Sequence, residues 1–167
     1  MYENRLFLIE EWHVNEYIFR IMGLENKIEK NKSLSKKLKA LAAVCLFFSF
    51  CYCYGSASIK NVDRSEGIAT NVVWIVSIIA LVGIFLKDSQ CIKTNKATKF
   101  DIYRLEVEEL NTKKEVARIT GNGLPDYMYD KQIDAPDGTI TLPIAYYGVL
   151  VGIDIIIRIW LLINHGI

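Results

Sequence analysis

Three apolar runs, each about as long as a bilayer is thick, alternate with charged segments along this chain. Residues 40–59 and 67–86 are uncharged, and residues 142–163 contain one acid and one base. A membrane-spanning helix needs about 20 mostly apolar residues, a length that each run reaches. A pair of very apolar core helices in a soluble domain is the alternative, and the length of the uncharged runs disfavours it. The three runs also leave too little chain for a separate soluble domain of ordinary size. We therefore predict an α-helical membrane protein with three transmembrane helices.

The segments between these runs divide the rest of the chain. Residues 1–39 form an N-terminal polar segment, 60–66 a short loop and 87–141 a second polar segment. Within the first, residues 5–22 mix apolar and charged side chains, and apolar residues recur at helical spacing at Val14, Ile18, Ile21, Leu24 and Ile28. We expect an amphipathic helix that lies on the membrane surface or packs on the second polar segment. Its acidic residues favour packing.

Residues 100–120 fit two structures. Tyr103, Leu105 and Val107 alternate with charged residues, which is the strand period, and 111–114 are suited to a turn. As a helix, Thr112 and Glu115 have the spacing of a capping box. We favour a small β-hairpin and keep the helix as the alternative. Residues 121–126 (GNGLPD) predict a loop immediately afterwards.

The basic residues indicate an orientation in the membrane. Seven lie between Arg20 and Lys39, two lie in the loop 60–66, five lie between Lys87 and Arg104, and none follows the third run. Basic residues beside spans are enriched on the cytoplasmic side. We therefore predict a cytoplasmic N-terminus and an external C-terminus in a bacterial-type inner membrane. No cleavable signal is visible, so the first run would serve as a signal-anchor.

The third run carries the most informative side chains. Asp154 and Arg158 are opposite in charge and four residues apart, so they are neighbours on one helix face. Gly148 and Gly152 have the spacing that lets two membrane helices approach closely, and Asp154 lies about 200° around the helix from Gly152. Ionisable residues inside a membrane are costly and rarely accidental. The pair fits a structural ion pair, a polar contact to another membrane protein, or part of an ion path.

The first two runs also present small residues on one face. Cys45, Ser49 and Cys53 recur every four residues in the first, and Ser77, Ala80 and Gly83 recur every three in the second. Such faces suit close helix packing. The pattern predicts a compact three-helix bundle that is able to associate with itself.

No residue pattern indicates catalysis, a cofactor or a metal. The two histidines, His13 and His165, fall on opposite sides of the predicted membrane, and the cysteines Cys51 and Cys53 have no second ligand pair nearby. Asp126, Asp130, Asp134 and Asp137 lack the dense ligand spacing of an EF-hand loop. The net charge of +1 on 167 residues gives no indication of nucleic-acid binding. We expect a protein that is not an enzyme and has neither cofactor nor metal.

In size and plan, the chain is similar to small inner-membrane proteins of phages and plasmids that provide superinfection exclusion or immunity. This resemblance is one of architecture and includes no motif. It implies a protein that binds or blocks another membrane component, in contact with the lipid bilayer and with a membrane-protein partner or a second copy of itself. The alternatives are an oligomeric pore or transport component, and a membrane-anchored effector or scaffold that senses a cytoplasmic signal.

Overall fold

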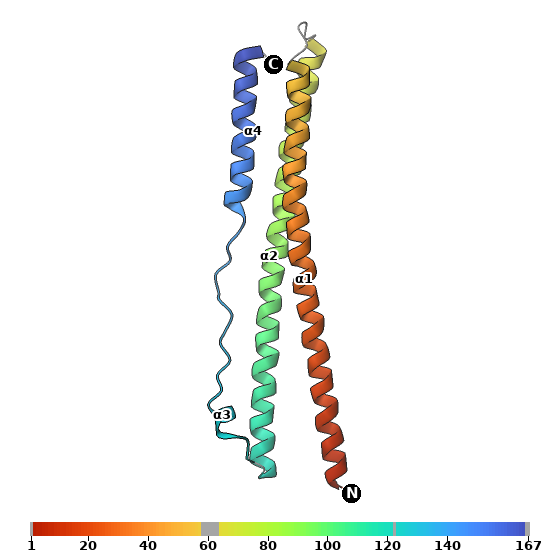
Figure 1. The fold of residues 1–167 in the computed structure, drawn as a ribbon, viewed down its shortest axis with the longest axis vertical. Helices are drawn as coiled ribbons and strands as arrows, with labels where there is room; N and C mark the ends of the chain where they lie inside the picture. Colours follow the sequence, from red (N-terminus) through yellow and green to blue (C-terminus); the bar gives the residue numbers. More distant parts are fainter. Residues whose placement is uncertain (1, 58–63, 122, 166–167) are drawn as a thin grey trace. The chain divides into compact units, whose positions relative to one another are not determined.

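The computed structural model is helical wherever it has regular secondary structure among the residues that it describes. These are residues 2–57, 64–121 and 123–165 for the backbone, with side chains at 15–56, 67–121 and 123–164. Four helices follow one another: α1 (Tyr2–Ala57), α2 (Arg64–Thr120), the short α3 (Asp126–Tyr129) and α4 (Ile144–His165), as Figure 1 shows. Three of them are long and apolar enough to cross a membrane, which confirms that prediction.

The first two helices continue far beyond their apolar runs. The first 124 residues contain no proline, so nothing in the sequence removes a backbone hydrogen bond from α1 or α2. All three prolines (Pro125, Pro136 and Pro143) fall between α2 and α4. Gly121, with φ +70°, follows the last residue of α2 and supplies the left-handed conformation that ends many helices. The loop predicted at 121–126 therefore begins where α2 ends.

The β-hairpin favoured for residues 100–120 is wrong, because this stretch is the last part of α2. Its apolar residues also fit a second pattern, a repeat of about 3.5 residues. The residues that follow it are Phe100, Tyr103, Val107, Leu110 and Ala117. Ala117 is buried and the other four are half-buried. This is the period of helices that pack along one another, and the local alternation around Leu105 concealed it.

The separate amphipathic helix expected at 5–22 is likewise absent from the described backbone. That stretch is part of the continuous helix α1. Beyond residue 14, the half-buried or buried positions include Tyr17, Ile21, Leu24 and Ile28, whereas Ile18 is exposed.

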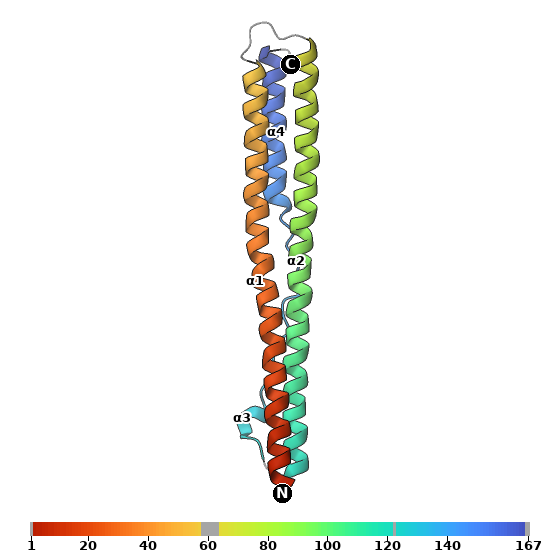
Figure 2. The same ribbon diagram turned by 90° about the vertical axis from the view of Figure 1, so that its right-hand side faces the viewer.

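The chain divides into two compact units. Unit 1 comprises residues 1–31 and 93–140, and unit 2 comprises 32–92 and 141–167. In unit 2, α4 lies beside both α1 and α2 (Figures 1 and 2). Ala42, Leu81 and Tyr147 form one buried cluster, and Cys53 and Leu161 form another. The outward side chains of unit 2 are largely apolar, as at Phe48, Ile79 and Ile156, which suits contact with lipid.

Candidate intramembrane polar site

Asp154 and Arg158 face the interior of unit 2. Their exposed fractions are 5% and 6%, although neighbouring residues on other faces of α4, such as Ile156 and Ile159, are exposed. The helix geometry explains this difference, because residues four apart lie on one face. That face also includes the buried residues Tyr147 and Leu161. The two charges therefore lie against α1 and α2 within the same chain.

Arg158 is held by α2. Its Nη2 donates a hydrogen bond to Asn71 Oδ1, and its guanidinium lies 6.0 Å from the centre of the Trp74 ring. Asn71 in turn donates from Nδ2 to the carbonyl oxygen of Gly67 at 2.9 Å. A hydrogen bond to a charged group contributes about 1.5–3 kcal/mol, and an aromatic face adds cation–π attraction. These contacts join the end of α4 nearest the C-terminus to the start of α2.

Asp154 and Arg158 form no ion pair within the described residues. Asp154 Oδ2 and Arg158 Nη1 are both buried and lack a hydrogen-bond partner there. Trp74 Nε1 approaches the Asp154 carboxylate, but it makes no hydrogen bond of ordinary geometry to any described residue. The two residues share a face, as the sequence predicts, while Arg158 takes its hydrogen-bond acceptor from another helix.

Gly148 and Gly152 lie away from this polar face. A β-carbon placed on either glycine would meet no atom within 4 Å. Gly148 is exposed and Gly152 is half-buried. The glycine spacing is therefore not used to bring α4 close to α1 or α2.

A second buried acid lies near the other end of unit 2. Asp88 in α2 has no exposed surface, and its Oδ2 accepts a hydrogen bond of 3.1 Å from the Tyr147 hydroxyl. The Tyr147 ring also packs edge-on against Phe85 with 5.4 Å between ring centres. Sequence reasoning missed Asp88 because it follows Lys87, just outside the apolar run. The signal in the sequence was that Asp88 lies two residues after the apolar run, in a stretch without proline, so that the same helix continues through it.

A groove of about 660 Å³ runs between α1 and α2. Small residues from both helices line it, among them Cys45, Ser49, Ser77 and Ala80, with Phe48 and Tyr52 at α1. The hydroxyl oxygens of Ser49 and Ser77 are buried and have no hydrogen-bond partner in the described residues. The small faces predicted for the first two runs thus meet at a groove.

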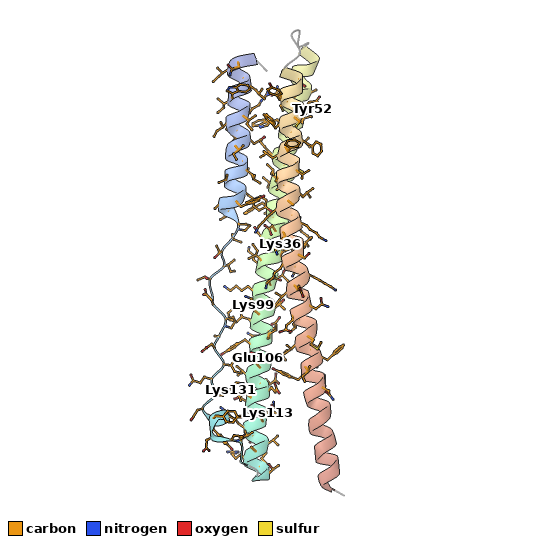
Figure 3. All side chains as sticks on the ribbon, viewed as in Figure 1. Lys36, Tyr52, Lys99, Glu106, Lys113 and Lys131 are labelled. Atoms are coloured by element: carbon orange, nitrogen blue, oxygen red, sulfur yellow. The ribbon has the colours of Figure 1, made fainter. Side chains whose placement is uncertain are left out.

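Unit 1 has a smaller, polar pocket that contains charged side chains of both signs. Tyr17, Glu106, Glu109, Lys113 and Lys131 line it, and three of these are labelled in Figure 3. Glu109 pairs with Lys113 at 2.5 Å, one helical turn away. No group of three or more potential metal ligands occurs in the described part of the chain.

Comparison with known proteins adds no relative. No protein-family model, curated protein or solved structure matches the chain.

Proposed function

We propose that this protein is a non-enzymatic, multi-pass protein of a bacterial-type inner membrane that binds a helix of another membrane component and thereby blocks it. The observation that carries the proposal is the groove between α1 and α2. It combines small residues with the partnerless hydroxyls of Ser49 and Ser77 at membrane depth.

Small residues and hydroxyls are the groups that membrane helices use at their contacts. Without a hydrophobic driving force between helices in lipid, association depends on close packing and on interhelical hydrogen bonds. An incoming helix with a polar side chain would pack against Ala80 and, once the buried serine side chains rotate toward the groove, supply hydrogen-bond partners for both. A lipid acyl chain would fill the groove but leave both hydroxyls unsatisfied.

The glycine face of α4 offers a second contact surface. Because nothing lies within 4 Å of a β-carbon at Gly148 or Gly152, a neighbouring helix has room to approach there. This face is suited to the same partner or to a second copy of the chain.

Arg158 has a positioning role in this proposal, because its bond to Asn71 orients α4 relative to α2. Asp154 is also turned inward, but its Oδ2 has no partner among the described residues, and neither residue contacts the partner directly. The orientation that we propose has the N-terminus in the cytoplasm and the C-terminus outside, from the distribution of basic residues. A role in superinfection exclusion or immunity is the form of blocking that the size and plan favour.

Photo-crosslinking in intact membranes tests the proposal. A photoreactive residue at Tyr52, beside the groove, should give a discrete protein adduct. Ala80→Leu fills the groove and should abolish this adduct, whereas Ile79→Leu, on the exposed neighbouring position, should leave it intact. The same comparison between Gly148→Leu and Val149→Leu tests the glycine face. An adduct at twice the chain's mass identifies a second copy as the occupant.

Adducts to lipid alone at both surfaces would refute the proposal. The pore alternative makes a different prediction, because purified protein in vesicles would then conduct ions. The buried cluster of Ala42, Leu81 and Tyr147 fills the interior of unit 2 at one level. A conducting path would therefore have to form between copies.

A further inference from the structure

One end of unit 2 carries an unpaired group of lysines. Lys32, Lys36, Lys37 and Lys39 are on α1 and Lys87 is on α2, and we call these five residues the lysine cluster. Four are exposed and Lys39 is half-buried. None of the five takes part in an ion pair among the described residues. The ion pairs there join Glu16 to Arg20, Glu109 to Lys113 and Glu115 to Arg118.

In the two stretches of sequence that contain the cluster, the one acid is withdrawn from the surface, and the exposed Glu29, three residues before Lys32, makes no ion pair among the described residues. Residues 32–59, and 67–92 apart from Asp88, contain no aspartate or glutamate. Asp88 has no exposed surface and accepts the Tyr147 hydrogen bond. Its carboxylate is therefore committed to the contact with α4, and the lysines are left without an ion-pair partner among the described residues.

The cluster lies where the apolar part of the bundle begins. The Tyr146 hydroxyl donates a hydrogen bond of 2.9 Å to the carbonyl oxygen of Lys39, which ties the start of α4 to α1 at this level. Tyr146 is 38% exposed, and tyrosines of this kind are enriched at the membrane–water interface. Lys36, labelled on α1 in Figure 3, lies one turn before Lys39. The lysines are therefore at the depth of lipid headgroups.

We infer that the lysine cluster binds the headgroups of anionic phospholipids. Each ammonium offers three donors to phosphate oxygens, and none of the five is ion-paired to a carboxylate among the described residues. Clusters of four to eight basic residues beside a membrane span attract anionic lipid, with each residue adding about fivefold to the association. This binding is additional to any effect of the same lysines on insertion orientation, and it does not depend on the proposed protein partner.

Spin-labelled lipids measure this binding directly. The full-length protein is reconstituted in symmetric phosphatidylcholine vesicles that contain trace spin-labelled phosphatidylglycerol or phosphatidylcholine. Electron paramagnetic resonance then gives the fraction of each label immobilised at the protein surface. We expect preferential immobilisation of phosphatidylglycerol, reduced by added salt because exposed charges are screened. Symmetric vesicles make the result independent of which way the protein inserts.

Three sets of variants identify the residues responsible. Lys32→Gln, Lys36→Gln and Lys87→Gln together should lower the preference severalfold, because each removes one of the charges that attract the headgroup. The corresponding arginine variant should retain it. Replacement of Lys113, Lys114 and Lys131 by glutamine, all in unit 1, removes equal charge and should leave the preference unchanged. Equal immobilisation of both labels by the native protein, or equal loss in the two glutamine sets, would overturn the inference.

Discussion

Tyr147 and Asp88 join α4 to α2 through a hydrogen bond of 3.1 Å between the phenol hydroxyl and carboxylate Oδ2. Both residues are buried, at 5% and 0% exposure. A buried carboxylate that loses its donor retains the cost of desolvation, which makes the donor's removal more harmful than an ordinary lost contact. This pair fixes how α4 is rotated at the end of unit 2 that carries the lysine cluster.

Tyr147→Phe should therefore destabilise the protein by about 1–3 kcal/mol, since Asp88 loses the hydrogen bond from Tyr147 while the aromatic packing against Phe85 remains. Thermal unfolding in detergent measures the change. Tyr146→Phe is the matched control. The hydrogen bond from the Tyr146 hydroxyl to the Lys39 carbonyl oxygen is exposed, so water is able to replace it. Equal effects of the two substitutions would argue against the buried hydrogen bond.

Asn71→Leu should destabilise the contact between α2 and α4. The substitution removes the acceptor of the Arg158 guanidinium, which is buried and has another nitrogen already without a partner. We expect a loss of about 1–3 kcal/mol in unfolding free energy. Val72→Leu changes an adjacent, lipid-facing position and should be neutral. If both variants unfold at the same temperature, the Asn71 bond contributes nothing.

Asp154→Leu should leave stability unchanged or raise it by about 1–3 kcal/mol. The substitution removes a buried oxygen that has no partner, and Arg158 keeps its contacts with Asn71 and Trp74. Thermal unfolding of Asp154→Leu and Arg158→Leu, measured side by side, separates the two roles. A large loss of stability in Asp154→Leu, equal to that in Arg158→Leu, would mean that the residues act as a charge pair.

Solvent accessibility along residues 101–111 should follow the helical period. Asp101, Arg104, Glu108 and Asn111 are exposed, at spacings of three and four residues, and the residues between them are half-buried. Nitroxide labels placed singly at successive positions should show collision rates with a water-soluble relaxation agent that peak at these four sites. A peak at every second position would instead support the β-hairpin.

The turn at Asp137 should depend on pH. The backbone N–H of Thr139 donates to Asp137 Oδ1 at 3.0 Å and the Thr139 hydroxyl donates to Oδ2 at 2.8 Å. The backbone bond first, and then the hydroxyl bond, lower the pKa of Asp137 below its ordinary value. The turn is therefore fully stabilised above the pKa of the unfolded group, about 3.9, and is lost as the pH falls through the lower folded pKa.

Nuclear magnetic resonance of the Thr139 amide proton in detergent measures this transition. Its chemical shift should change only in acid, below the ordinary titration range of aspartate. Asp137→Asn should remove that dependence, because the amide side chain does not titrate. A midpoint at or above the ordinary aspartate value would contradict the role of the two hydrogen bonds.

The apolar runs alone indicate where the chain is able to cross a membrane, because bilayer thickness fixes the length of apolar helix required. The sequence also indicated a loop at residues 121–126, since glycine and proline are concentrated there. It placed Asp154 and Arg158 on one face of a helix, which the helical repeat alone dictates. These are local properties that depend on a few neighbouring residues.

Contacts between helices, in contrast, establish which face of each helix has a partner. The polar face of α4 turned inward because Asn71 and Trp74 on α2 offer contacts to Arg158, while Gly148 and Gly152 were left open. The continuity of α2 through residues 100–120 was equally undetermined, since Tyr103, Leu105 and Val107 fit both periods. Asp88 gained its role from Tyr147, 59 residues away. Such choices depend on contacts between distant segments, which no local pattern specifies.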